Sequence, residues 1–188
     1  PSQERIFSQG TYVGELARER FPGGILIDTD YDKISEAFDL TKEALENGTS
    51  TIFEGVFSFD NVLVRPDIIK KDENDDWEII EVKSSTSVKE ENIHDVAVQK
   101  YVLKCAGIDV KKTYLMHINT ECVYPDLSNL FAIEEITEQV NEVLPTVTSK
   151  LDGLRKMLAL VDRPDIQIGQ HCFSPYGCPF IDHCWSWI

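Results

Sequence analysis

Apolar residues near the start of the chain recur at helical spacing and then give way to a short extended run. Residues 3–20 carry apolar side chains three and four positions apart, which predicts a helix, and the Pro-Gly-Gly sequence that follows ends it. Residues 25–27 are a short strand candidate. A second helix is predicted over residues 32–47, with Gly48 in the C-terminal cap position.

The central part of the chain changes to an apolar period of two, which is typical of strands. Residues 51–59 and 62–69 are predicted to be two strands, which Asp60 and Asn61 join by a turn. Residues 77–83 are the third strand of this series. The second and third strands are close enough in sequence to pair as a hairpin.

Helical spacing returns in the second half of the chain. Residues 89–106 are predicted to be a helix that ends at Gly107, and residues 113–118 to be a further strand. Residues 133–160 are helical by pattern, but Pro145 lacks the N–H that a helix interior needs. Two helices are therefore expected there.

This order of elements predicts an α/β (α+β mixed) fold with a mixed central sheet flanked by helices. Residues 1–162 are expected to form this core. Residues 163–188 have no periodicity and are rich in Cys, His, Pro and aromatic residues, which predicts a separate cysteine-rich tail held by something other than an apolar core. No apolar run approaches the roughly 20 residues that span a bilayer, so no membrane association is expected.

Composition narrows the expected partners and compartment. The net charge of −15, from 18 basic and 33 acidic residues, argues against non-specific coating of nucleic acid. Contact with DNA must then come from local basic residues such as Arg65, Lys70 and Lys71. An odd number of cysteines without a secretory signal predicts a reducing, cytoplasmic location. Because the chain starts at Pro1 rather than at a methionine, we expect it to be a fragment.

The third strand carries charges at positions that should enter the core. Alternation places Ile79, Glu81 and Lys83 on one face of this strand. Charges that enter a core are costly unless they serve a function there. Asp67 ends the preceding strand, so a hairpin would bring its carboxylate beside that of Glu81. Two carboxylates at that distance repel unless a cation neutralises them, and hard oxygen ligands suit Mg²⁺ or Mn²⁺.

A metal ion held by Asp67 and Glu81 would make a bound water more acidic and stabilise charge on a phosphodiester under attack. Lys83 is positioned to orient the water or to neutralise that charge. The backbone carbonyl of Val82 is a candidate extra ligand. The alternative is structural: Glu81 and Lys83 form a surface ion pair, and Asp67 is a turn residue after proline.

The pattern Pro66-Asp67 … Glu81-Val82-Lys83 resembles the PD-(D/E)XK nuclease superfamily. That resemblance implies a restriction-endonuclease-like core. The helix that follows resembles its RecB-like branch, which includes the CRISPR-associated Cas-type exonucleases. That resemblance implies that Gln99 and Tyr101 lie near the active site. Tyr101 lies about 200° round the helix from Gln99, so it is alternatively a core residue.

Relatives in this branch often place a histidine ligand in the first helix, and that position falls on Gly14 here. Glu15 and Glu54 are the candidates to replace it, or the site uses fewer protein ligands. For each of these glutamates an exposed or capping role is the alternative.

The tail spaces Cys172, Cys178 and Cys184 by five residues each, and thiolates so close in a coreless segment suggest a soft metal or a cluster. The resemblance implies a 4Fe–4S iron–sulfur cluster in the intact protein. The relatives usually have a first gap of two residues, and they supply a fourth cysteine from the N-terminus, which this chain lacks. A zinc site that uses His171 or His183, or free thiols, are the alternatives.

The leading hypothesis is therefore a metal-dependent, RecB-like DNA exonuclease that acts on ends or single strands, with a helicase or a repair or defence complex as partner. A second hypothesis is a catalytically weak or inactive nuclease fold that binds nucleic acid or assembles such a complex. A third is an interaction module whose metal-bound cysteine tail is the functional part.

Overall fold

The computed structural model describes residues 3–30, 32–174 and 176–186. The chain forms two compact units, Pro1–Val147 and Thr148–Ile188. Their boundary lies inside the long helix α4 (Thr137–Leu158), upstream of residue 163, where the cysteine-rich tail is predicted to begin. Each unit is described by itself below.

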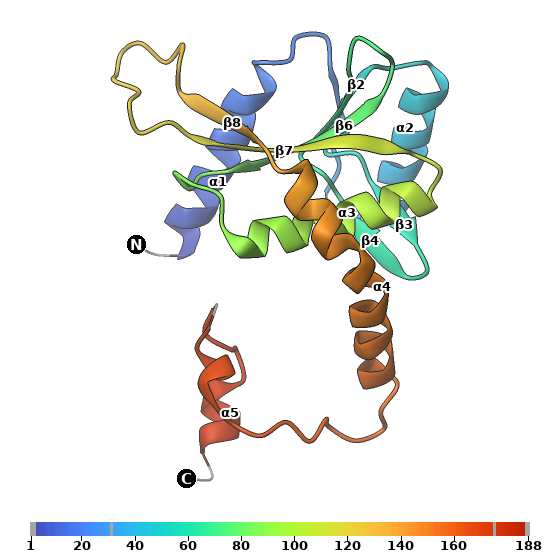
Figure 1. The fold of residues 1–188 in the computed structure, drawn as a ribbon, viewed down its shortest axis with the longest axis vertical. Coiled ribbons are helices and arrows are strands. Elements are labelled where there is room, and N and C mark those ends of the chain that lie inside the picture. The colour runs from blue at the N-terminus through green and yellow to red at the C-terminus, as the bar shows by residue number, and fades with distance from the viewer. Residues whose placement is uncertain (1–2, 31, 175, 187–188) are drawn as a thin grey trace. The chain divides into compact units, whose positions relative to one another are not determined.

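A mixed six-stranded sheet is the centre of the first unit, which confirms the predicted fold class (Figure 1). The β1–β2 and β6–β7 pairs are parallel, and the other neighbours in the sheet are antiparallel. The strands of this sheet, in spatial order, are β1 (Ile25–Leu26), β2 (Thr51–Phe53), β5 (Ile68–Lys71), β6 (Trp77–Lys83), β7 (Val110–Ile118) and β8 (Phe131–Glu135). A separate antiparallel pair consists of β3 (Phe57–Phe59) and β4 (Val62–Val64).

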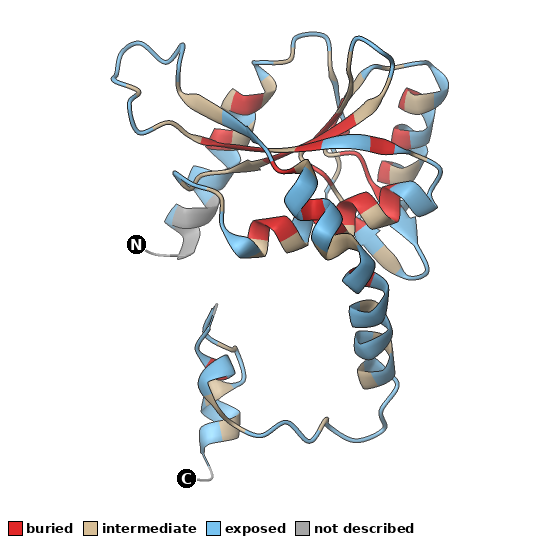
Figure 2. Ribbon diagram, in the orientation of Figure 1, coloured by how far each residue is buried: buried red, intermediate tan, exposed pale blue. Residues whose placement is uncertain are grey.

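Helices cover both faces of the sheet. Ala17 of α1 (Gln3–Arg18) packs into a buried apolar cluster with Ile80 and Met116. Side chains alternate along β6, so Glu81 points to the opposite face, where it bonds to α3 (Glu90–Cys105). Figure 2 shows the resulting core as buried residues on the sheet and along α3. The helix α2 (Ile34–Glu46) lies between β1 and β2 in the chain.

The predicted strands 51–59 and 62–69 are each divided in two. Glu54 has a left-handed backbone (φ 56°), which ends β2 and cannot continue a strand. Pro66 has no N–H to donate to a sheet and lies between β4 and β5. As a result, β2 and β5 belong to the six-stranded sheet, whereas β3 and β4 pair with each other in the separate one.

The predicted turn at Asp60 and Asn61 is confirmed. Both residues have positive φ (49° and 61°), as a two-residue hairpin between right-twisted strands requires. Gly24 is required for a different reason, because a Cβ there would lie 2.4 Å from the ring of Phe53. That glycine lets the chain pass close to β2 as it enters β1.

The prediction for residues 133–160 is wrong in two respects. Phe131–Glu135 forms β8, because it pairs with β7 along the whole of its length. The helix that follows, α4, is one helix that contains Pro145 rather than two helices. Pro145 is exposed, so the carbonyl that lacks its usual partner can be hydrated and the helix continues.

The second unit has almost no buried core. Cys172, in the short 3-10 helix Gln170–Cys172, is the buried residue among those that the structure describes here. The backbone N–H of Cys178 donates to its carbonyl at 2.8 Å, and Phe173 contacts Trp185 of α5 (Ile181–Trp185) edge to face. No helix in the described part of the chain is both long and apolar enough to cross a membrane.

Candidate metal centre

Three carboxylate residues lie at neighbouring positions across β2, β5 and β6. The pairing of these strands places Glu54 beside Asp67 and Asp67 opposite Glu81, and the N–H of Glu54 donates to the Asp67 carbonyl at 3.0 Å. The N–H of Val82 donates to Asp67 Oδ2 at 2.6 Å. The structure thus brings Asp67 and Glu81 side by side, as the hairpin predicts.

The electrostatics of this group follow from burial. Burial and the nearby Glu81 carboxylate raise the pKa of Asp67 well above its usual range, although the N–H of Val82 opposes them. Burial also raises the pKa of Glu54, against the effect of Arg65 and Arg18. Both carboxylates are costly to keep charged, and a bound cation would remove that cost.

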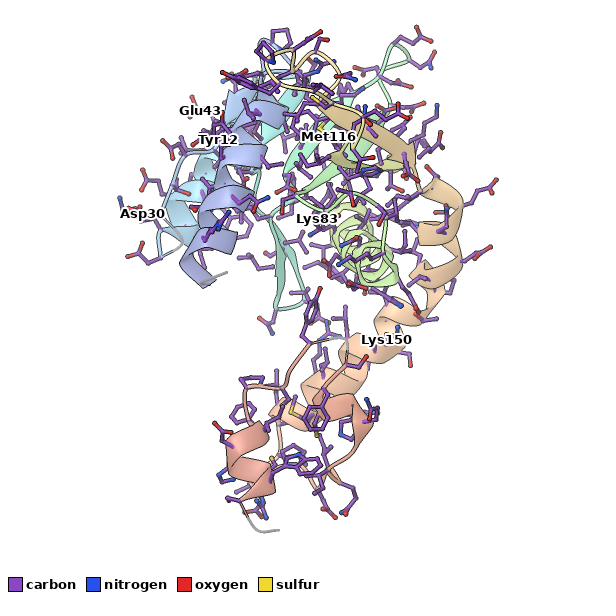
Figure 3. The ribbon with its side chains drawn as sticks, turned by 90° about the vertical axis from the view of Figure 1, so that its left-hand side faces the viewer. Tyr12, Asp30, Glu43, Lys83, Met116 and Lys150 are labelled. Atoms are coloured by element: carbon purple, nitrogen blue, oxygen red, sulfur yellow. The ribbon has the colours of Figure 1, made fainter. Side chains whose placement is uncertain are left out.

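Glu81 is held by hydrogen bonds to both of its oxygens. Lys83 Nζ donates to one oxygen at 2.8 Å, and Gln99 Nε2 donates to the other at 2.8 Å. Lys83 also lies 3.5 Å from Asp95 on α3. Burial lowers the pKa of Lys83, but the carboxylates of Glu81, Asp67 and Asp95 outweigh it and raise that pKa, so the ammonium stays protonated. Figure 3 shows Lys83 on the sheet beside α3.

The two α3 residues that the resemblance points to are placed differently. Gln99 bonds to Glu81, and its own Oε1 is buried without a hydrogen-bond partner among the described residues. Tyr101 instead packs edge to face on Phe59, with ring centroids 6.3 Å apart. Gln99 thus joins the carboxylate group, and Tyr101 has a packing role.

A cavity of about 630 Å³ lies beside Asp67, on the side of the sheet that α1 covers. Glu15 and Glu54, the two candidates for a third ligand, both line it, and so does Gly14. Glu54 is engaged elsewhere, since its Oε2 lies 3.3 Å from Arg65 Nε. Glu15 is exposed at the cavity wall.

The donors present suit a hard cation that keeps much of its water. Mg²⁺ is commonly held by one or two carboxylates and completes its shell with water and substrate oxygens. Asp67, Glu81 and the Val82 carbonyl match that donor set. Within residues 3–30, 32–174 and 176–186, no three or more His, Cys, Asp and Glu side chains are arranged as a ready metal-binding cluster, and this includes the three tail cysteines.

Sequence reasoning missed Arg18, which lines the cavity. The signal was the four-residue spacing of Gly10, Gly14 and Arg18, which puts them on one helix face. His117 on β7 bonds to Glu134 of β8 at 2.6 Å and so links these two strands.

Comparisons with known proteins do not identify the family. No family model matches the chain, and no curated protein matches it. Among solved structures, it is similar to a chain described as "Crystal structure of SSO0001", at 12% sequence identity and a TM-score of 0.30. The match covers 76% of this chain and 84% of that one, and a score this low supports no argument about fold or function.

Proposed function

We propose that this protein is a metal-dependent nuclease of the PD-(D/E)XK kind, which hydrolyses phosphodiester bonds. The observation that carries the proposal is the proximity of the Asp67 and Glu81 carboxylates, with Lys83 bonded to Glu81 at 2.8 Å. Asp67 also lines a cavity. A raised pKa at a buried carboxyl group, coupled to neighbouring charges, is typical of functional sites.

Each residue of the group has a distinct part in this reaction. Asp67, Glu81 and the Val82 carbonyl would hold Mg²⁺ or Mn²⁺, which when bound supplies an acidified water and a counter-charge for the phosphate. Lys83 keeps its proton and offers a fixed positive charge to the phosphate oxygens. Gln99 holds the Glu81 carboxylate in position.

The substrate we propose is DNA, at ends or in single strands, as the RecB-like resemblance implies. A net charge of −15 is compatible with this because the metal ion and a few local cations supply the attraction. A helicase or a repair or defence complex is the proposed partner. A 4Fe–4S cluster on Cys172, Cys178 and Cys184 is proposed only for the intact protein.

Two variants separate metal binding from catalysis. Asp67→Asn should lose Mn²⁺ binding in calorimetry and also lose cleavage of single- and double-stranded DNA. Lys83→Met should keep Mn²⁺ binding but lower the cleavage rate by about 100-fold or more, because it removes only charge stabilisation.

Asp75→Asn and Lys111→Met are matched controls, since both remove a charge from an exposed ion pair. Both should cleave at the parent rate. Equal cleavage by parent, Asp67→Asn and Lys83→Met would mean a contaminating nuclease, and the proposal would be abandoned.

A second candidate is a nuclease fold that binds nucleic acid without cutting it. Gly14 stands where relatives place a histidine ligand, and the described residues offer no three-ligand cluster. DNA binding by the parent without cleavage in Mg²⁺ or Mn²⁺ would favour this candidate.

A further inference from the structure

Arg18, the last residue of α1, lines the same cavity as Asp67 and Glu54. It is half-buried, and it makes no hydrogen bond or ion pair with any residue that the structure describes. Its charge is felt by Glu54, whose pKa it lowers. A partly buried guanidinium without a partner is unusual, because its five N–H donors are strong and fixed in direction.

The neighbouring glycine leaves room for this guanidinium. A Cβ at Gly14 would lie 3.9 Å from one terminal nitrogen of Arg18, so the side chain folds back along α1 over the glycine. A Cβ at Gly10, one turn earlier, would meet nothing within 4 Å. Gly10, Gly14 and Arg18 therefore form an open cavity wall that ends in a positive charge.

A second polar group without a partner lies in another segment of the cavity wall. Thr29 lines the cavity, and its Oγ1 is buried without a hydrogen-bond partner among the described residues. A buried hydroxyl without a partner is costly, and a bound oxygen anion would satisfy it. Arg65, the other cation of the cavity, is already bonded to Glu54 and to the Ile27 carbonyl at 2.8 Å. Arg18 is thus the cation left to meet a ligand.

We propose that Arg18 and Thr29 form a phosphate-binding subsite that holds a backbone phosphate next to the one at the metal centre. This rests on the proposed nuclease function. Guanidinium groups bind phosphate with two parallel hydrogen bonds, which fixes position as well as adding affinity. The cavity has the size of pockets that enclose a small ligand, so it accepts a single strand or a frayed end rather than an intact duplex.

The test is binding of a fluorescein-labelled oligothymidylate of about 12 nucleotides, followed by anisotropy in Ca²⁺, which takes the same oxygen ligands as the catalytic ions. Arg18→Gln should weaken binding about tenfold and lower the slope of log affinity against log salt by about one. Thr29→Val, which keeps the shape and removes the hydroxyl, should weaken binding about threefold.

Arg20→Gln is the matched control, since it removes the same charge two residues along the chain and outside the cavity. It should change affinity less than about twofold, because the hydrogen bond that it also loses, from Arg20 Nη1 to the Ser128 carbonyl at 3.0 Å, involves no residue of the cavity, and the rest is distant attraction. Arg18→Lys keeps the charge without the forked geometry and should recover part of the affinity, which also guards against a folding defect in Arg18→Gln.

The subsite is overturned if the parent does not bind the oligonucleotide, or if Arg18→Gln and Arg20→Gln weaken binding equally. The same experiments distinguish a failure of the subsite proposal from a failure of the proposed nuclease function. Binding that depends on Arg18, without cleavage in Mg²⁺ or Mn²⁺, keeps the subsite and removes the enzyme. Cleavage by the parent with unchanged binding in Arg18→Gln keeps the enzyme and removes the subsite.

Discussion

The two units of this chain differ in how they can be stabilised. In the first unit, β6 buries Ile79 and Ile80 on opposite faces. Two glutamates of the same strand are tied to neighbouring elements, Glu81 to Gln99 of α3 and Glu78 to Lys70 of β5. In the second unit, Cys172 is buried, whereas Phe173, Tyr176 and Phe180 are between 50% and 68% exposed. The first unit has an apolar core that can bear the cost of buried charges. The second has no comparable core among the residues that the structure describes, so its apolar side chains contribute little to its stability.

The largest expected difference between the units is in the cost of deleting apolar side chains. Ile79→Ala should lower the free energy of unfolding by about 2–5 kcal/mol, because it leaves a cavity at a fully buried position. Ile166→Ala, at an exposed position of the second unit, should change it by less than about 0.5 kcal/mol. Urea unfolding followed by far-UV circular dichroism measures both. Similar losses would mean that the second unit has a core after all.

Metal ions should stabilise the first unit in a pH-dependent way. At about 100 times its dissociation constant, Mn²⁺ should add about 2.7 kcal/mol to the free energy of unfolding, measured by thermal melts. The gain should be smaller at pH 5 than at pH 7.5, because Asp67 and Glu54 have raised pKa values and hold protons that compete with the ion. Asp67→Asn should remove the gain. A gain that persists in this variant would place the ion elsewhere, for example on the tail cysteines.

Without metal, the same carboxyl group should destabilise the fold at neutral pH. The folded-state pKa of Asp67 is raised above its ordinary value of 3.8, so the folded protein holds this proton more tightly than the unfolded chain. That contribution to stability is complete below the unfolded value and is lost as pH rises through the folded one. Asp67→Asn should therefore raise stability at pH 7.5, on the order of 1 kcal/mol, in metal-free melts. Asp75→Asn, at an exposed carboxylate, should have no such effect.

The smallest effect concerns two helical glycines, one in each unit. A Cβ at Gly10 or at Gly153 would meet no atom within 4 Å, so alanine fits at both positions. Gly10→Ala should stabilise the first unit by about 0.5–1 kcal/mol, because alanine is the better helix former. Gly153→Ala should leave the main unfolding transition unchanged, since the second unit does not share that core. A shift of the same size in both would show that the units unfold together.

Local patterns predicted the parts of the fold where a single force dominates. The Trp77–Lys83 strand and the Asp60-Asn61 turn were predictable because alternation and turn chemistry act within a few residues. The pairing of Asp67 with Glu81 followed from hairpin spacing. By contrast, the helical pattern predicted from residue 133 onward overlaps the strand Phe131–Glu135, because the pairing of that strand with β7 is a contact between distant segments.

The rest of the candidate site depends on backbone geometry that sequence patterns do not reveal. The left-handed Glu54 is not a glycine, so nothing in its identity marked the end of β2. Helix geometry separates Tyr101 from Gln99, but their partners, Phe59 and Glu81, come from other segments and are known only from the contacts. Arg18 was overlooked because spacing shows only that it shares a helix face with Gly10 and Gly14, whereas the cavity beside that face is visible only in three dimensions.

The hydrogen bond from Val82 to Asp67 affects which substitutions this site can tolerate during evolution. The carboxylate is anchored by a main-chain N–H, which every residue except proline supplies. Other apolar side chains that fit against α1 can therefore replace valine at position 82 without loss of the main-chain hydrogen bond to Asp67. Glu81 has no such latitude, since its length sets its reach to both Lys83 and Gln99. We therefore expect related chains to vary at position 82 and to keep glutamate at position 81.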